Sequence, residues 1–269
     1  MEVKYLMENK ELILYQKKGR LATIIINRPE KANSVNSEML KSLHESLIDA
    51  DKDEKVKCII LKSSGDRFFS AGYDLKQVLS DPEIAGKIIE WGRKVNETMI
   101  LMKKPIISQV QGIAIGFGAM VILASDLKIF ADRPTEELYL KLPEIEISAF
   151  PQTGATLLPL LAFGLNFAKR VLLTADEFGL DELKAMNFPT RIFPLEELDS
   201  GTLSFAKKIS KFQMEFLVFI KSMLTIMDKA YIQKCFDLEE ACGKVAYDTK
   251  KKSMSELDDF IKSLSDKFI

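Results

Sequence analysis

The chain has 269 residues, enough for one large domain or for a domain with a helical extension. Apolar residues make up 47% and the formal net charge is −1, so a substantial core can form. Bulk electrostatics give no reason to expect a nucleic acid or an acidic membrane surface as a partner. The sequence shows no secretory segment and no apolar run that could span a bilayer, so we expect a cytoplasmic protein.

One histidine and three cysteines restrict the available chemistry. The cysteines, Cys58, Cys235 and Cys242, have no metal-ligand spacing and are expected to be reduced structural residues. His44 lies in an amphipathic helical pattern, and we interpret it as a half-buried or surface helix residue. Ser-His-Asp hydrolysis or a multi-histidine metal site would depend on it. Acid–base chemistry is therefore expected from a carboxylate, a lysine or a tyrosine.

Strand-like and helix-like segments alternate through the first two thirds of the chain. The first half predicts strands at 12–16 and 22–26, a helix capped by Ser37 and running to about 51, a strand at 56–61, a helix at 82–102 and a strand at 106–110. The continuation predicts a buried helix at 118–125, a strand at 127–131, and helices at 154–163, 166–173 and 176–187, the last capped by Asp176. This alternation indicates an α/β architecture with right-handed crossovers.

The rest of the sequence is almost entirely helical. The expected helices are 206–210, 216–229, 238–247 and 255–267, so we divide the chain into an α/β core, 1–198, and a helical C-terminal region, 199–269. An apolar stripe could be core, a subunit contact or an acyl-chain wall; it comprises Phe216, Phe219, Ile220, Met223, Leu224 and Met227, followed by Tyr231 and Phe236. The run Lys250–Lys252 is either a solvated surface or a phosphate contact.

Two glycine turns carry the strongest functional signal. Residues 68–76 (FFSAGYDLK) and 111–118 (QGIAIGFG) each follow an apolar, strand-like run and lead into helix-like sequence. Two such turns side by side can direct two backbone N–H groups at one point, which is how a protein holds an anionic oxygen without a charged side chain.

Together with residues 27–36 (NRPEKANSVN), these turns resemble the crotonase superfamily, the enoyl-CoA hydratase/isomerase group, from about Gly19 to Glu197. The resemblance implies a spiral of repeated ββα units and acyl-CoA chemistry through an enolate-like intermediate, as in fatty acid metabolism. It implies a coenzyme A thioester as the substrate, no other cofactor and no metal, and a homotrimer or homohexamer. It does not by itself fix the reaction, because one scaffold hosts many reactions.

The resemblance also assigns candidate site residues. It places the oxyanion hole at the backbone N–H groups of Tyr73 and Phe117, the second where the family usually has glycine. Phe117 follows Gly116, and its ring is expected to line or narrow the acyl pocket. Matched positions that line the coenzyme A or lie near it are Lys31, Ala32, Arg67, Ala71, Asp74, Leu75 and Lys76.

Two further positions bear on the reaction. Hydratases of the family use two glutamates, and the first of these positions is Met120 here, whose thioether cannot orient a water usefully. The second is Glu144, in a Pro-Glu-Ile turn. One glutamate opposite an apolar residue is similar to the mitochondrial-type Δ3,Δ2-enoyl-CoA isomerase pattern. A single base can move a proton from C2 to C4, and burial would raise its pKa. We therefore expect an enoyl-CoA isomerase with Glu144 as acid and base.

Alternatives remain open at the sequence level. Glu146 is a rival base, since residues i and i+2 of a strand face the same way, and Glu136 and Glu137 are more distant rivals. A second isomerase pattern of the family would require a glutamate where this chain has Gln152. A hydratase, hydrolase or decarboxylase could use Glu144 with help from Tyr139 or Glu146. A non-catalytic acyl-CoA-binding protein is the alternative from another class.

Overall fold

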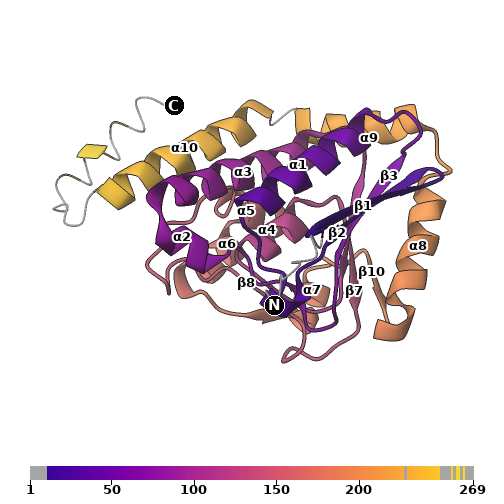
Figure 1. Ribbon diagram of the computed structural model, residues 1–269, viewed down its shortest axis with the longest axis horizontal. Helices are drawn as coiled ribbons and strands as arrows, with labels where there is room; N and C mark the ends of the chain where they lie inside the picture. Colours follow the sequence, from indigo (N-terminus) through magenta and orange to yellow (C-terminus); the bar gives the residue numbers. More distant parts are fainter. Residues whose placement is uncertain (1–10, 227–228, 249–255, 257–258, 261–262, 264–269) are drawn as a thin grey trace, which may run out of the picture.

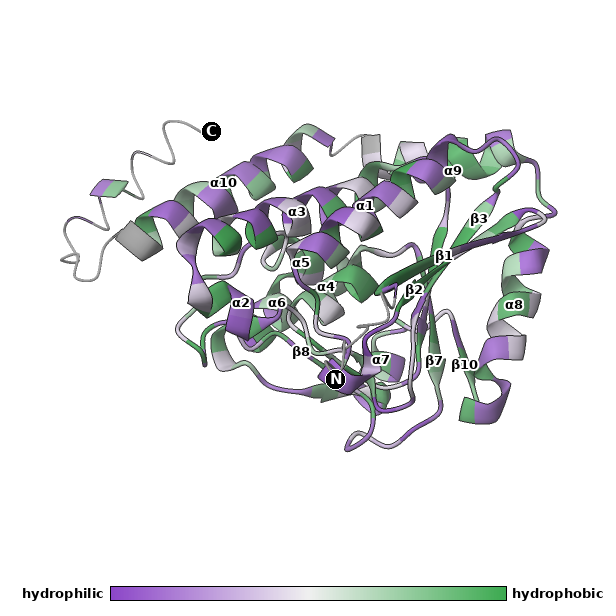
Figure 2. Cartoon of the chain, in the orientation of Figure 1, coloured by the Kyte–Doolittle hydropathy of each residue, from purple (hydrophilic) through white to green (hydrophobic). Residues whose placement is uncertain are grey.

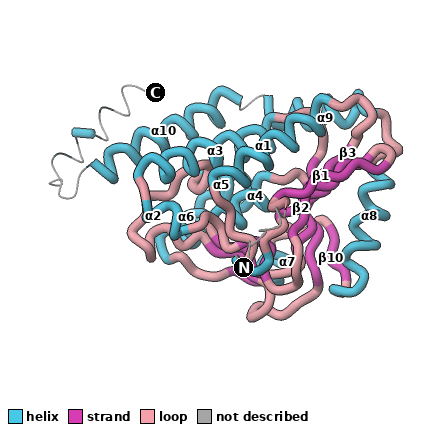
Figure 3. Tube along the Cα trace, in the orientation of Figure 1, coloured by secondary structure: helices cyan, strands magenta, loops and turns pink. Residues whose placement is uncertain are grey.

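The computed structural model describes residues 11–226, 229–248, 256, 259, 260 and 263. Met227, the run Lys250–Lys252 and most of the expected helix 255–267 lie outside these residues. Figure 3 shows strands and helices alternating until β10, after which helices follow. This is the predicted α/β class.

The larger sheet has six strands in the order β1-β2-β3-β5-β7-β10. They are β1 (Ile13–Lys18), β2 (Leu21–Ile26), β3 (Cys58–Ser63), β5 (Ile106–Val110), β7 (Leu127–Ala131) and β10 (Arg191–Phe193). The β1–β2 hairpin is antiparallel and every later pairing is parallel. The central strands are mostly apolar (Figure 2), as expected for a sheet covered on both faces, although Lys62, Gln109 and Lys128 interrupt the apolar runs.

The smaller sheet has the order β4-β6-β8-β9 and positions the glycine turns. Its strands are β4 (Phe68–Ser70), β6 (Ile113–Ile115), β8 (Tyr139–Lys141) and β9 (Phe178–Gly179). The pairing of β4 with β6 is parallel, so the turns that follow these strands leave the sheet at the same edge. These strands have two or three residues each, too few to show a period of two in the sequence.

Helices cover the larger sheet on both sides (Figure 1). Helices α1 (Ser37–Lys52) and α3 (Pro82–Leu101) pack together on one side, and α8 (Leu198–Ile209) contacts β3, β5 and β7. The others are α2 (Leu75–Ser80), α4 (Phe117–Ala124), α5 (Leu157–Phe163), α6 (Leu165–Thr174), α7 (Leu180–Ala185), α9 (Met214–Ile226), α10 (Lys229–Asp248) and two 3-10 turns, Pro29–Lys31 and Leu195–Glu197. Every residue of α4 is buried, in agreement with its uninterrupted apolar sequence.

Two predicted helix caps are wrong. Asn36, not Ser37, caps α1, because its side-chain oxygen accepts the N–H of Met39 at 2.8 Å. Asp176 caps no helix: its carboxylate pairs with Arg170 at 3.0 Å, and the next helix, α7, begins at Leu180 after the short strand β9. In the first case a neighbouring polar residue takes the capping role, and in the second an ion pair engages the carboxylate and the helix begins later.

The C-terminal helices lie on the core. Helix α9 packs on α3, and α10 packs on α3 and α5. Phe236 is buried, so it belongs to the core of this chain and not to an exposed stripe. The division at residue 198 stays a prediction. Within the described parts of the chain, no helix combines the length and the apolar character that crossing a membrane requires.

Candidate active site

The two glycine turns contact one another directly. Gly72 has φ +85°, a left-handed conformation that favours glycine, and a Cβ there would lie 2.7 Å from the carbonyl oxygen of Ile115. The same Cβ would lie 3.3 Å from the backbone nitrogen of Phe117. The turn after β4 and the turn after β6 can therefore meet only because residue 72 has no side chain.

Two backbone N–H groups at this contact are free of intramolecular acceptors among the described residues. Phe117 is the first residue of α4, where N–H groups have no acceptor within the helix. The bridge between Val35 and Tyr73 uses the carbonyl of Gly72 and the N–H of Asp74, and it leaves the N–H of Tyr73 unused. The turns thus bring together the two donors that the sequence predicted.

The side chains of these two residues also pack together. The ring of Tyr73 stacks on that of Phe117, and its hydroxyl lies 2.9 Å from Oγ1 of Thr153. On its other side the hydroxyl lies against α3, since a Cβ on Gly92 would come within 2.0 Å of it. Burial raises the pKa of Tyr73 far above its usual range, so this hydroxyl is a neutral hydrogen-bonding group.

Glu144 lies beside the same turn. A Cβ on Gly116, the residue that precedes α4, would be 3.5 Å from Oε1 of Glu144. Oε2 is buried and has no hydrogen-bond partner. Burial raises the pKa of Glu144 to about 7, and the nearby charge of Glu239 acts in the same direction. A carboxyl group with such a pKa can take up and release a proton near neutral pH.

Met120 lies one turn further along α4 and is fully buried. Its sulfur accepts from Oγ1 of Thr153 at 3.4 Å and lies 4.0 Å from Nδ2 of Asn96. Asn96 also donates to the carbonyl oxygen of Thr153 at 2.8 Å, while its own Oδ1 is buried without a partner. The wall behind Tyr73 is therefore built from a thioether, a hydroxyl and an amide, with no carboxylate from α4.

The rival bases lie elsewhere. Residues 144–148 form a turn and not a strand, so the argument that Glu146 faces the same way as Glu144 is wrong. Glu146 is exposed and pairs with Lys141 at 3.0 Å. Glu137 pairs with Arg133 at 2.6 Å, and Glu136 is exposed.

The two other residues that the alternatives named are also placed. Tyr139 lies on β8, and its pKa is raised by burial and by Glu177, with Lys141 and Arg67 as its other charged neighbours. Gln152 is buried, with its amide against Gly243 of α10.

A pocket of about 370 Å³ adjoins the oxyanion turn. It is lined by Arg28, Lys31, Ser34, Ala71, Tyr73, Asp74, Leu75 and Lys76. It therefore unites five of the seven residues that the resemblance assigned to coenzyme A. Ala32 adjoins it, since its carbonyl accepts the N–H of Ala71 at 2.9 Å. Arg67 does not line the pocket: it is exposed and lies 5.3 Å over the ring of Phe68.

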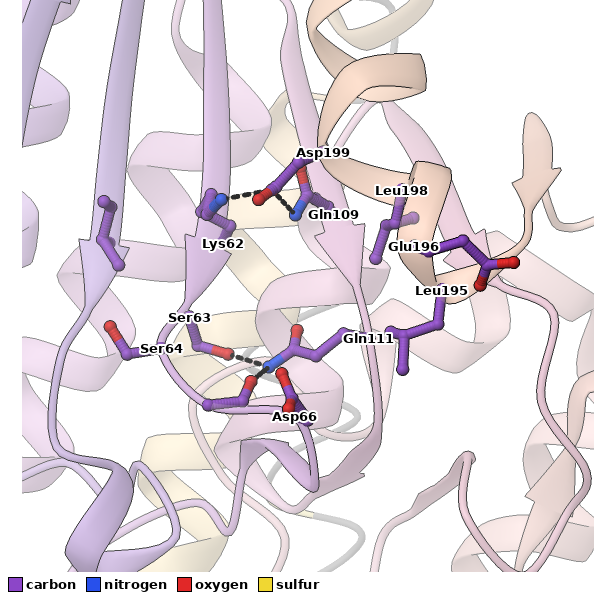
Figure 4. A pocket seen from close by; sticks show the side chains of 12 residues that line it. Lys62, Ser63, Ser64, Asp66, Gln109, Gln111, Leu195, Glu196, Leu198 and Asp199 are labelled. Atoms are coloured by element: carbon purple, nitrogen blue, oxygen red, sulfur yellow. Dashed lines mark hydrogen bonds and ion pairs between the residues drawn. The ribbon is translucent and has the colours of Figure 1, made fainter.

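A second hollow, of about 610 Å³, lies between the larger sheet and the start of α8 (Figure 4). Two of its charged groups pair with each other: Asp199 pairs with Lys62, and it also accepts from Gln109 at 2.6 Å. The amide nitrogen of Gln111 donates to Ser63 at 2.8 Å. The residues that line it include none of those predicted for the active site, so we do not place the chemistry there.

Several groups at the candidate site escaped the sequence analysis. Arg28 and Ser34 lie inside the 27–36 motif, so their sequence position was a usable signal. Thr153 and Asn96 carry no local signal, because each acts through tertiary contacts with Tyr73 and Met120.

Comparisons with known proteins identify the family of the chain. The model of the enoyl-CoA hydratase/isomerase family matches residues 16–262. The chain is 29% identical over 204 residues to a short-chain-enoyl-CoA hydratase of Clostridium acetobutylicum, covering 76% of each chain. It is 32% identical over 191 residues to a crotonyl-CoA hydratase of Syntrophomonas wolfei, covering 70% of this chain and 71% of that one.

A solved enoyl-CoA hydratase/isomerase from Mycobacterium paratuberculosis shares the fold, with a TM-score of 0.80, 23% identity, and coverage of 89% of this chain and 94% of that one. Fold and site define an enzyme that works on acyl-CoA thioesters. The chain belongs to the enoyl-CoA hydratase/isomerase family. The names of the similar proteins favour hydratase over isomerase, so the isomerase expectation stays a proposal.

Proposed function

We propose that this protein is an enoyl-CoA isomerase that shifts a double bond from C3 to C2 of an acyl-CoA thioester. The observation that carries the proposal is the combination of one carboxylate with a buried oxygen, Glu144, and a buried thioether, Met120, at the position where hydratases of the family have their first glutamate. The pocket lined by Lys31 and Lys76 would hold the coenzyme A, and no other cofactor is required.

The proposed reaction uses two groups of this chain. Ionised Glu144 takes a proton from C2, and the electron pair moves toward the thioester carbonyl to give an enolate. The N–H groups of Tyr73 and Phe117 stabilise the negatively charged enolate oxygen by hydrogen bonds, without a charged side chain. Protonated Glu144 then donates the same proton to C4 as the C3–C4 double bond becomes C2–C3. A pKa of about 7 suits both steps.

Hydratase activity is the second candidate, and the names of the similar proteins favour it. It would need a group to orient water opposite Glu144. The groups near Met120 are neutral: the hydroxyls of Tyr73 and Thr153 and the amide of Asn96. They could hold a water by hydrogen bonds, but none can share the proton transfer at neutral pH.

Incubation with trans-3-hexenoyl-CoA and, separately, with crotonyl-CoA distinguishes these candidates. The proposal predicts trans-2-hexenoyl-CoA from the first substrate and little 3-hydroxybutyryl-CoA from the second. Rapid hydration without double-bond migration would establish the hydratase instead. Tight binding of both thioesters without turnover would indicate the non-catalytic alternative. A homotrimer or homohexamer remains part of the proposal.

A further inference from the structure

Glu239 is a buried carboxylate on α10 that the proposed reaction does not use. It is 4% exposed and lies far along the chain from both glycine turns. Its Oε2 accepts the N–H of Gly154 at 2.6 Å. Its Oε1 accepts the N–H and the hydroxyl of Thr156, at 2.9 and 2.5 Å, and the N–H of Leu157 at 3.4 Å. Three of these donors are backbone N–H groups, which can only donate, so they favour the carboxylate form.

These hydrogen bonds fix the segment that adjoins the candidate site. Thr153 precedes Gly154, has a left-handed φ of +62° and holds the hydroxyl of Tyr73. Such a conformation is uncommon in a threonine and is maintained by its surroundings. The carbonyl of Thr153 accepts from Asn96, and the next N–H donates to Glu239. Helix α10 is thus connected to Tyr73 through two adjacent residues, Thr153 and Gly154.

We propose that Glu239 is a positioning residue of the active site: it anchors residues 153–157 from α10 and places a second, fixed negative charge near Glu144. The proposal rests on the proposed role of Glu144 as the base. It assigns the buried carboxylate of the C-terminal helix to the control of catalysis and not only to the attachment of α10.

The charged surroundings of the pair support an electrostatic role. Glu239 raises the pKa of Glu144, as does burial, and it raises the pKa of Tyr73. Burial raises the pKa of Glu239 itself, while its hydrogen bonds oppose the rise. The other ionisable neighbours of Glu239 are Cys235 and Cys242 on the same helix, which burial keeps as neutral thiols. Arg93 of α3 contacts α10 too, but it is engaged with Asp237 and Glu240.

The chain provides a matched control. Glu240 is the next residue of α10, but it is partly exposed and pairs with Arg93 and Lys244, both at 2.7 Å. Glu239→Gln removes the buried charge and retains the shape, whereas Glu240→Gln removes a screened charge of the same helix. Glu239→Asp keeps the charge but shortens its reach to the N–H groups.

The test is the pKa of Glu144, measured by NMR titration of 13C-labelled glutamate, with the resonance assigned from its loss in Glu144→Gln. We expect Glu239→Gln to lower this pKa by roughly half a unit or more, because a like charge has been removed. Glu240→Gln should leave it unchanged. Glu239→Asp should retain the raised pKa even where it lowers the melting temperature.

The same variants separate this proposal from the proposed function. If the protein isomerises 3-enoyl-CoA, the acidic limb of the pH–rate profile should move to lower pH in Glu239→Gln by the same amount as the NMR titration. A shift in the NMR titration without isomerase activity would uphold the role of Glu239 and overturn the proposed function. An unchanged pKa in folded Glu239→Gln, or a pKa lowered equally in Glu239→Asp, would overturn the role of Glu239.

Discussion

The rings of Tyr73 and Phe117 stack with their centroids 4.9 Å apart and their planes at 24°, and the same two residues supply the backbone N–H groups of the proposed oxyanion hole. The contact between side chains therefore fixes the relative position of the two turns in addition to the close approach at Gly72. A stacked aromatic pair contributes about 1 kcal/mol beyond the area that it buries. The stack also occupies space beside the position of the reacting acyl group.

Replacing Phe117 with alanine should widen the range of acyl chains that the enzyme accepts. Phe117 is fully buried, so its truncation leaves a cavity next to the oxyanion hole and lowers the free energy of unfolding by about 3 kcal/mol. We expect kcat/KM for a ten-carbon 3-enoyl-CoA to rise about tenfold relative to the six-carbon substrate, which corresponds to about 1.4 kcal/mol. Phe117→Leu is the control, because it keeps most of the volume. An unchanged chain-length preference in Phe117→Ala would mean that the ring does not limit the pocket.

The raised pKa of Glu144 makes the stability of the protein depend on pH. A folded-state pKa of about 7 exceeds the unfolded value, so the folded protein binds this proton more tightly. The resulting stabilisation is fully present below about pH 4 and is lost as the pH rises to about 7, for a total of about 3 kcal/mol. Urea unfolding at pH 5 and pH 8 should therefore show a smaller decrease in stability for Glu144→Gln than for the wild type. Parallel decreases would place the pKa of Glu144 near its ordinary value.

Introducing a carboxylate at position 120 should increase hydration. In Met120→Glu the new group would lie beside Thr153 and Asn96, where it could orient a water opposite Glu144. We expect hydration of crotonyl-CoA to rise at least tenfold over the wild type, while burial of a second charge lowers the free energy of unfolding by about 3 kcal/mol. Met120→Gln, which is neutral and of similar size, should show little increase. Fast hydration by the wild-type enzyme would refute this interpretation of Met120.

Helix α9 directs a buried lysine towards the core and exposes its apolar side chains. Lys221, 7% exposed on its side chain, pairs with Asp126 at 2.7 Å and donates to the carbonyls of Met99 and Lys104. The exposed apolar residues of the same helix are Phe216, Phe219, Ile220, Met223 and Leu224. A contiguous apolar face of this kind is typical of an interface between subunits.

We therefore expect light scattering to give a mass near three or six times 30.4 kDa. Phe219→Glu should shift the protein towards smaller species. Lys207→Glu, at an exposed residue of α8, should leave the mass unchanged. A wild-type monomer at micromolar concentration would exclude the oligomer and leave α9 as a cover of its own chain.

The sequence predicted those elements whose apolar runs have clear boundaries. The strand at 106–110 lies between Pro105 and a glycine turn, and the strand at 127–131 lies between Asp126 and Asp132; both occur with the predicted bounds. The strands β4, β6, β8, β9 and β10 were missed, because two or three residues carry no detectable period. Asp176 was a reasonable cap in isolation, but an ion pair with Arg170 determines its position.

The candidate site depended on more than local pattern. The glycine turns could be recognised from the sequence, because close backbone contact requires glycine at Gly72 and Gly118. Glu144 was identified because it matches a glutamate position of the family. The prediction that Glu146 faces the same way as Glu144 failed, because the segment is a turn and not a strand. Glu239 could not be distinguished from Glu240 in an amphipathic helix, since only the packing of α10 on α5 buries one and exposes the other.

We propose Glu144 as the single acid and base of an isomerase. The most direct test is the steady-state rate of trans-2-hexenoyl-CoA formation from trans-3-hexenoyl-CoA by Glu144→Gln and, as the matched control, Glu146→Gln. We predict that kcat falls about a thousandfold in Glu144→Gln, with binding of the thioester largely preserved, and stays within about twofold of wild type in Glu146→Gln. Near-wild-type turnover by Glu144→Gln would contradict the assignment of the base.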